Sequence, residues 1–460
     1  MKASQFNLTY NYEKYYVLLN TKTKNVVRFP LEQSTLVDEV LAQNSFHSNS
    51  LIEEMLFEKG FLVHDNSNEL DDIYKECYEL VNSEILYLTI MPTYTCNLAC
   101  VYCFQHHISD AIMDQITEKN IIMAVEKNIN KYKALYVEWF GGEPLLAKKQ
   151  VINMNKKFKE ICRCAKVPYA SRITTNGFFL DIDTFEQMFK NNCFVYYISI
   201  DGGKELHDKQ RPCKSGHGSY EVIMRNLSQI KDKVISRNFR IEIRVNCSSH
   251  MYCEFEHFLS DFEKKFGKDK RFLLIIETVN DWSDRTKEMR RRGQLLTHSN
   301  MSELGKIAHK YNISLASMDK HSLKTQMCQA GKRNAYSIFY DGTIHKCQMA
   351  LESDEYRRLD TIGKVTDNGE FDIEREKESI WVKDFFPKSC EKCRLLPMCL
   401  GKKRNGYGGI EPQKEIQGYE CEGVEEKFLD IYMAYDASKL ENIPLFFFDN
   451  YCTKCLKVNL

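Results

Sequence analysis

The sequence has 460 residues, enough for two or three domains that each bury a core. Lys plus Arg and Asp plus Glu both number 64, so the formal net charge is zero and a generally basic nucleic-acid-binding surface is not expected. The first 16 residues lack the apolar core of a signal peptide, and no apolar run is long enough to span a bilayer. We therefore expect a soluble, cytoplasmic protein with neither a nucleic-acid nor a membrane partner.

Residues 1–84 predict a small winged-helix-like domain. Tyr15–Leu19 and Val26–Phe29 are apolar runs separated by a polar turn, which is typical of a β-hairpin. Amphipathic helices are expected near Leu31–Leu41 and Ser50–Glu58, with a short strand after Gly60. A charged helix over Asp71–Glu84 leads out of the domain.

Residues 85–315 alternate between short apolar runs and helical patterns, which predicts an α/β fold. Repeated β-then-α units favour a parallel sheet with right-handed crossovers. Six such units suit an open, partial (β/α)6 barrel better than a closed eight-stranded one. The expected strands are Leu86–Met91, Leu135–Phe140, Ser171–Thr175, Val195–Ile200, Arg240–Val245 and Phe272–Glu277; the expected helices are Met113–Asn128, Val151–Ala165, Phe185–Lys190, Tyr220–Ile230 and Phe255–Phe266.

Cysteine is unusually common, with 18 residues, and several of them cluster at short spacings. In a reducing compartment, clustered thiols indicate metal ligands before disulfides. Residues 316–460 lose the regular periodicity while cysteines return between turn residues, which predicts a loop-rich domain that depends on metal for its core. The scattered Cys77, Cys193, Cys247 and Cys253 are interpreted as free thiols.

Cys96, Cys100 and Cys103 follow the first predicted strand of the sheet. Thiolates at these offsets on one loop can occupy three corners of an iron–sulfur cube. The loop supplies no fourth cysteine, so one iron would stay open for a further ligand. The alternative is a zinc site completed by His106 or His107.

This spacing resembles that of the radical S-adenosylmethionine (SAM) superfamily. The resemblance implies that Cys96, Cys100 and Cys103 are the catalytic cluster ligands and that the open iron of a [4Fe–4S] cluster binds SAM. Reduction would then split the sulfonium to a 5′-deoxyadenosyl radical. The cofactor would carry the chemistry, and the protein would position it and exclude side reactions.

Segments after later strands resemble the family's SAM contacts. Trp139 to Pro144 matches the segment that binds the SAM amino group, with Gly141 and Gly142 allowing close backbone approach and Glu143 accepting from an ammonium. The resemblance also assigns SAM contacts to Tyr102, Ser199, Asp201, Arg244 and Asn246. Each segment alone could be an ordinary βα turn. Together they place polar groups at the strand ends where barrel enzymes build active sites.

The C-terminal region resembles a SPASM domain, which implies one or two auxiliary Fe–S clusters. The candidate ligands are Cys328, Cys347, Cys390, Cys393, Cys399 and Cys421. The last four would complete one cluster, and a zinc knuckle is the alternative. Lys403 stands where relatives carry another cysteine, so Cys452 and Cys455 are considered as replacements for the missing ligands, with an ordinary C-terminal tail as the alternative.

The N-terminal domain resembles the peptide-recognition domain of enzymes that mature ribosomally made peptides. Those domains bind a leader peptide as an added strand. A DNA-reading winged helix and a purely structural cap are the alternatives. The leading hypothesis is a radical SAM/SPASM peptide maturase that abstracts a hydrogen from a precursor peptide, installs a thioether or another crosslink, and takes electrons from ferredoxin or flavodoxin.

Two other functions are weighed against this one. Modification of a folded protein or small metabolite is one; but Gln348 stands where sulfatase-maturating relatives carry a catalytic aspartate, and an amide takes no proton. A non-catalytic iron–sulfur electron carrier is the other. The open cluster corner and the SAM-contact segments argue against a carrier.

Overall fold

The computed structural model describes residues 1–42, 51–105, 110–279, 284–296, 300, 303–304, 307–308, 310–311, 327–348, 361–386 and 388–400. His106, His107, Cys421, Cys452 and Cys455, and Lys403, lie outside the described residues.

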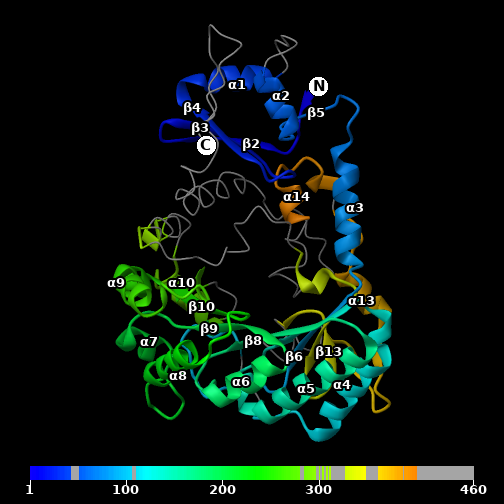
Figure 1. The fold of residues 1–460 in the computed structure, drawn as a ribbon, viewed down its shortest axis with the longest axis vertical. Coiled ribbons are helices and arrows are strands. Elements are labelled where there is room, and N and C mark those ends of the chain that lie inside the picture. Colours follow the sequence, from blue (N-terminus) through cyan, green and yellow to red (C-terminus); the bar gives the residue numbers. More distant parts are fainter. Residues whose placement is uncertain are drawn as a thin grey trace.

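A ten-stranded sheet organises the larger part of the protein, in the order β11-β10-β9-β8-β7-β6-β12-β13-β14-β15 (Figure 1). From β11 to β12 all neighbours pair in parallel, and from β12 to β15 they pair antiparallel. All six expected strands form, which confirms the α/β fold class. The strands are β6 (Ile85–Met91), β7 (Ala134–Trp139), β8 (Tyr169–Thr175), β9 (Cys193–Ser199), β10 (Arg240–Cys247), β11 (Phe272–Thr278), β12 (Ala335–Phe339), β13 (Thr343–His345), β14 (Thr361–Val365) and β15 (Phe371–Ile373).

Helices follow the parallel strands and cover the outer face of the sheet (Figure 1). They are α4 (Gln115–Asn128), α5 (Lys148–Ala165), α6 (Ile182–Lys190), α7 (Lys204–Gln210), α8 (Tyr220–Lys233), α9 (Ser249–Phe266) and α10 (Asp284–Arg291). The sequence did not predict α7, a helix of 7 residues rich in charged side chains.

Alternation along the strands explains why the two faces of the sheet differ. In β7, Leu135, Val137 and Trp139 are buried in the core shared with the helices. The intervening Glu138 faces the other side, where its carboxylate binds the Arg172 guanidinium of β8 at 2.7 Å. Since successive side chains of a strand point to opposite faces, the inner face of the barrel is the polar one.

The cysteine-rich region contributes to this same sheet. Tyr336 and Ile338 of β12 enter the main core, and β12 pairs in parallel with β6. The sequence pattern predicted only a loop-rich segment here, because a five-residue strand gives little periodicity. The domain boundaries at residues 84 and 315 stay predictions.

The N-terminal unit is built on a second, three-stranded antiparallel sheet in the order β2-β3-β4. Val17 and Leu19 face one side of it, whereas Leu18 lies in a core with Phe29 and the helices α1 and α2 on the other. The elements are β1 (Lys2–Ala3), β2 (Asn7–Tyr12), β3 (Tyr15–Asn20), β4 (Val26–Pro30), a 3-10 turn (Leu31–Gln33), α1 (Ser34–Leu41), α2 (Leu51–Glu58) and β5 (Leu62–Val63), which pairs with β1. The expected hairpin, helices and short strand are confirmed as elements, and β1 and β2 are additions.

Helix α3 (Glu69–Val81) runs between the N-terminal unit and the barrel, and α14 (Leu396–Cys399) lies against the N-terminal sheet (Figure 1). Leu395 and Met398 pack on the sheet face formed by Leu8, Val17 and Leu19. The Thr21 hydroxyl donates to the Arg394 carbonyl, and the Tyr74 hydroxyl of α3 donates to Glu391 at 2.7 Å. The N-terminal sheet is thus packed on the segment that carries Cys390, Cys393 and Cys399. The remaining helix of this region is α13 (Arg375–Trp381).

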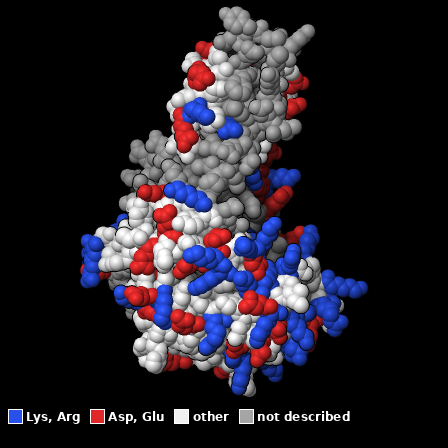
Figure 2. Space-filling view, turned by 60° about the vertical axis from the view of Figure 1, so that its left-hand side comes forward, with Lys and Arg blue, Asp and Glu red and all other residues white. Residues whose placement is uncertain are grey.

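Basic and acidic side chains intermingle over the face of the barrel that Figure 2 shows. This distribution agrees with the zero net charge of the sequence. Within the described residues, the helices are too short or too polar to cross a bilayer.

Candidate functional site

The cysteine loop follows β6 and is held by main-chain hydrogen bonds to residues 210–214. The Ala99 amide donates to the Pro212 carbonyl at 2.8 Å, and the Val101 amide donates to the Gln210 carbonyl at 3.0 Å. Leu98 and Cys213 form an isolated antiparallel bridge. The loop is therefore fixed by the chain that follows β9.

The three predicted cluster ligands are neighbours. Burial is the main reason that the pKa of Cys96 rises to about 12, and the charges of Cys100 and Cys103 add to that rise. Burial likewise raises the pKa of Cys100 to about 11, with the Arg211 cation acting in the opposite direction. Thiols in this setting need a cation to become thiolates, and a bound iron–sulfur cluster supplies one.

Within the described residues, no group of three Cys, His, Asp or Glu side chains is already arranged to hold a metal ion. The donor set itself fits an iron–sulfur cluster, because cysteine thiolates are the usual ligands of such clusters and the loop supplies three cysteines. Rotation of the cysteine side chains would redirect their sulfurs.

A fourth cysteine lies in this neighbourhood, which the sequence did not reveal. Cys213 is buried beside Leu98 and Cys96. The pKa of Cys213 is raised by burial and by Asp208. Cys213 is therefore a packing neighbour of the loop.

Glu143 is fully buried at the end of the segment after β7. Its carboxylate accepts from the Thr175 hydroxyl at 2.7 Å, from the Asn176 amide at 2.7 Å and from the Leu145 amide at 3.0 Å. Burial is the largest effect on its pKa, which is raised. Asn176 connects Glu143 to the cysteine loop, because its side-chain amide nitrogen lies 3.7 Å from the Cys96 sulfur. Glu143 thus ties the ends of β7 and β8 to the cysteine loop, and its contact with SAM stays a prediction.

The structure gives a reason for Gly141 and Gly142 that the sequence did not show, and their contact with SAM stays a prediction. A Cβ on Gly142 would stand 2.1 Å from the Thr95 carbonyl oxygen, and Gly141 has φ +121° with the Thr93 carbonyl oxygen 2.5 Å from a Cβ. The space that a side chain would need is occupied by the main chain leading into Cys96. Both glycines are therefore required for two loops to pack together, whether or not SAM approaches them.

Three of the predicted SAM contacts meet at one buried carboxylate. Asp201, fully buried, accepts from the Tyr102 hydroxyl and from the Asn246 amide, the latter at 2.8 Å. The Asn246 side chain donates to the Tyr102 hydroxyl at 3.1 Å. Residues from the cysteine loop, the end of β9 and the end of β10 are therefore joined in one hydrogen-bond network.

Arg211 is the main residue that the sequence did not single out. Its guanidinium donates to the Tyr102 hydroxyl at 2.6 Å and lies 3.8 Å from Asp201. The side chain is buried, and its Nε has no hydrogen-bond partner among the described residues. A buried cation beside Cys100 with an unused donor is suited to bind an anionic group.

Ser199 and Arg244 lie further along the same strand ends. They are register partners across β9 and β10. The Arg244 Nε donates to the Asn246 side-chain oxygen at 3.0 Å, which links Arg244 to the Asp201 network. Among the described residues, no hydrogen bond joins the Ser199 side chain to that network, so its role stays a prediction.

His207 supports this network as a neutral side chain. Its Nδ1 accepts from the Asp201 amide at 3.3 Å. Its Nε2 faces the Ser219 hydroxyl at 3.0 Å, and that hydroxyl donates to the Arg211 carbonyl. A proton on Nδ1 would be repelled by the Asp201 amide hydrogen, so this hydrogen bond requires an unprotonated Nδ1. Burial first, and then the charge of Arg211, lower the pKa of His207 to about 3.

We expect His207 to make the protein less stable in mild acid. In the unfolded protein the His207 imidazole binds a proton below about pH 6.5, whereas in the folded protein it stays neutral until the pH nears 3. The unfolded state binds more protons in that window, so the free energy of unfolding falls by roughly 1.4 kcal/mol per pH unit below 6.5. Urea unfolding at pH 7, 6 and 5 should show a smaller fall for His207→Gln than for the unmodified protein. Equal slopes would contradict the prediction.

The described C-terminal cysteines occupy two places. Cys328 precedes a short 3-10 turn and Cys347 follows β13, both partly buried against the main core. Cys390, Cys393 and Cys399 belong to the segment beneath the N-terminal sheet, where Cys393 contacts the apolar cluster of Leu395 and Met398. Their ligation of auxiliary clusters stays a prediction.

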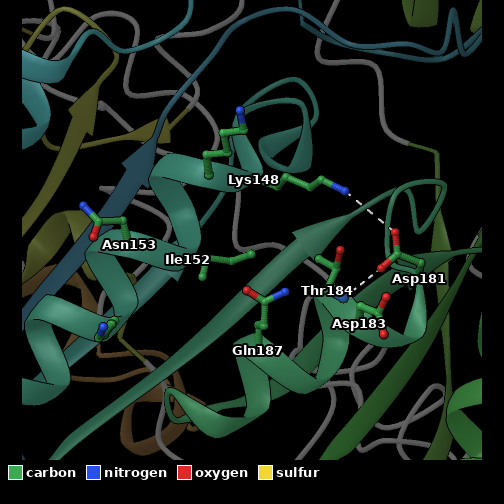
Figure 3. A pocket seen from close by; sticks show the side chains of 9 residues that line it. Lys148, Ile152, Asn153, Asp181, Asp183, Thr184 and Gln187 are labelled. Atoms are coloured by element: carbon green, nitrogen blue, oxygen red, sulfur yellow. Dashed lines mark hydrogen bonds and ion pairs between the residues drawn. The ribbon is translucent and has the colours of Figure 1, made fainter.

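A surface groove lies between α5 and α6 (Figure 3). Charged side chains of both signs line it, and Lys148 pairs with Asp181 at 3.7 Å. Asp181 also accepts from the Thr184 amide at the start of α6. The groove belongs to the outer, helical side of the barrel and contains none of the predicted site residues.

Comparisons with known proteins agree with this geometry. Residues 90–244 match the family model of the Radical SAM superfamily. The cysteine-type anaerobic sulfatase-maturating enzyme of Clostridium perfringens is 22% identical over 384 residues, which cover 75% of this chain and 95% of that protein. The radical SAM cyclopropyl synthase TigE of Paramaledivibacter caminithermalis is 27% identical over 268 residues, which cover 53% of this chain and 54% of that protein.

The solved structure of anSMEcpe with bound AdoMet and Cp18Cys peptide has the same fold. Its TM-score is 0.56 at 20% identity, over 78% of this chain and 98% of that one. The family match, the fold and the position of the cysteine loop after β6 are therefore consistent with one another. Residues 90–244 of this chain form a radical SAM superfamily domain.

Proposed function

We propose that this chain is a peptide maturase that cleaves SAM reductively and abstracts a hydrogen atom from a ribosomally made precursor peptide, installing a thioether or another crosslink. The observation that carries the proposal is the buried Tyr102–Asp201–Asn246–Arg211 network beside the cysteine loop. An electron carrier has no need of a buried cation and a fixed tyrosine at its cluster.

The residues around the loop have separable roles in this proposal. Cys96, Cys100 and Cys103 would hold a [4Fe–4S] cluster, which would supply the electron for reductive cleavage of SAM. Arg211 offers its free Nε to the anionic end of SAM. Asp201 balances the charge of Arg211 and holds Tyr102 in one orientation. Little side-chain freedom would therefore be lost when SAM binds. Burial of these groups keeps water from the reacting centre.

A peptide substrate is supported by the N-terminal unit and by the relatives. Within the described residues, β2 and β4 each pair only with β3, and strands at the edge of a sheet are where an extended peptide can add as a further strand. A leader peptide docked on such an edge would present its core to the barrel. Among similar proteins, anSMEcpe binds the Cp18Cys peptide and TigE is a cyclopropyl synthase.

Auxiliary clusters complete the proposal. Cys390, Cys393 and Cys399, with Cys421, would bind one cluster; Cys328 and Cys347, aided by Cys452 and Cys455, would bind a second. These clusters would accept the electron that a product-forming step releases.

Sulfatase maturation is the second candidate, favoured by the similarity to the Clostridium enzyme. Gln348 argues against it, because its amide cannot serve as the base that the resemblance assigns to the aspartate at this position.

The test uses reconstituted, dithionite-reduced protein under anaerobic conditions. With SAM alone we expect release of 5′-deoxyadenosine, and its absence would favour the electron carrier. Candidate precursor peptides encoded near this chain are then added, in parallel with a cysteine-containing sulfatase peptide. Mass loss of about two hydrogens per crosslink in a precursor supports the maturase. Conversion of the sulfatase peptide to formylglycine would instead establish the second candidate.

A further inference from the structure

Gln105 lies just beyond the cysteine loop, with only Phe104 between it and Cys103. The side chain is 7% exposed, and its Nε2 donates to the Gly141 carbonyl at 2.9 Å. Its Oε1 is buried and has no hydrogen-bond partner among the described residues. Turning the amide over would not help, because a carbonyl oxygen cannot donate to the Gly141 carbonyl. The loop therefore holds a buried acceptor without a donor, which is costly unless a ligand supplies one.

Glu143, the acceptor that the sequence suggested for the SAM amino group, is already engaged within the protein. It is fully buried, and its carboxylate accepts hydrogen bonds from three groups, on Thr175, Asn176 and Leu145. A ligand at this end of β7 needs a further acceptor. The Oε1 of Gln105, held beside Gly141 by the other branch of the same amide, is such an acceptor.

A second unsatisfied atom, of opposite hydrogen-bond character, lies at the same loop. The Arg211 guanidinium donates to the Tyr102 hydroxyl at 2.6 Å, and its Nε donor has no partner in the described part of the chain. Gly141 follows β7 and Arg211 follows β9, with β8 between these two strands in the sheet. The loop is thus flanked by one unused acceptor and one unused donor.

The amino-acid end of SAM offers one partner to each of these atoms. Its carboxylate is an acceptor that suits the Arg211 donor, and its amino group carries N–H donors that suit Gln105. An amide oxygen is a neutral acceptor. It can therefore bind the amino group both as an ammonium and when the nitrogen is bound to iron, because N–H groups remain in either form.

We propose that the Oε1 of Gln105 accepts a hydrogen bond from the amino group of SAM, which makes Gln105 a cofactor-binding residue. The inference rests on the proposed function, because it requires SAM at the cysteine loop. The hydrogen bond to Gly141 fixes the amide before SAM binds, so little side-chain entropy is lost on binding. No proton moves and no covalent bond changes in this contact.

The test measures ligand affinity without turnover. Iron-loaded protein is equilibrated, anaerobically and without reductant, with SAM, with a SAM analogue whose amino group is replaced by hydrogen, and with decarboxylated SAM. We expect Gln105→Leu to raise the Kd for SAM about tenfold and to leave the Kd for the deaminated analogue unchanged. The Kd for decarboxylated SAM, which keeps the amino group, should rise by the same factor as that for SAM.

Gln187→Leu is the matched control, because Gln187 is an exposed residue of α6 in the groove of Figure 3. It should leave all three Kd values unchanged. Gln105→Lys is a second variant, whose ammonium can still donate to the Gly141 carbonyl but offers no acceptor. It should raise the Kd for SAM more than the Kd for the deaminated analogue. Iron per chain shows whether each variant holds its cluster.

Three results would overturn the proposal. An equal rise in Kd for SAM and for the deaminated analogue would show general damage to the loop, and an unchanged Kd for SAM would show that Oε1 does not bind it. Failure of both Gln105 variants to hold iron would mean that Gln105 supports the loop itself. If the unmodified, iron-loaded protein does not bind SAM, the proposed function itself has failed.

Discussion

Replacing Cys100 with alanine is expected to lower reductive SAM cleavage by more than about a thousandfold, equivalent to at least about 4 kcal/mol in the barrier. The variant leaves two thiols on the loop, which cannot hold a cube and keep one iron for SAM. The measurements are 5′-deoxyadenosine release with dithionite and iron per chain after anaerobic reconstitution.

Cys253→Ala is the matched control, because Cys253 is an exposed cysteine on α9. It should keep full activity and full iron content. Retained turnover in Cys100→Ala, or zinc in place of iron in the anaerobically purified protein, would contradict the cluster assignment.

Replacing Asp201 with alanine is expected to lower the free energy of unfolding by about 3–5 kcal/mol, because the change leaves the buried Arg211 cation without its partner. The Tyr102 hydroxyl and the Asn246 amide also lose their acceptor. Denaturant unfolding at pH 7 measures the effect, and the affinity for SAM should fall as Tyr102 is released.

Two further variants separate this explanation from general damage. Asp183→Ala, at an exposed carboxylate in the groove of Figure 3, should cost less than about 1 kcal/mol. Asp201→Ala/Arg211→Met removes both charges and should be more stable than Asp201→Ala alone. A double variant that is less stable than the single one would show that the unpaired charge is not the cause.

The repeated strands of the barrel could be predicted because each combines an apolar run with a following amphipathic helix. β9 and β10, for example, begin and end within two residues of the expected limits. β2 was missed even though Asn7–Tyr12 alternates polar and apolar residues as a strand does, because Leu8 is its only aliphatic and its only buried residue. β12 was missed because its partner, β6, lies some 250 residues earlier in the chain, and pairing over that separation leaves no local pattern.

The candidate site also combines local features that the sequence revealed with long-range contacts that it did not. The spacing of Cys96, Cys100 and Cys103 is a local feature, and the sequence alone identified it. The importance of Arg211 depends on burial beside Asp201 and Tyr102, which come from three different parts of the chain. The glycines illustrate a third case: their contact with SAM stays a prediction, whereas their role in letting two loops of the protein pack together is visible only in the structure.

The packing of the N-terminal sheet on Leu395 and Met398 affects how the role of that sheet can be studied. A shortened chain that starts at residue 85 would lose the proposed peptide-docking edge and, at the same time, uncover the apolar residues beside Cys393. Lost activity in such a fragment would therefore not distinguish failed substrate capture from collapse of the proposed C-terminal metal centre. Single substitutions on the outer edges of β2 or β4 keep that support in place and separate the two causes.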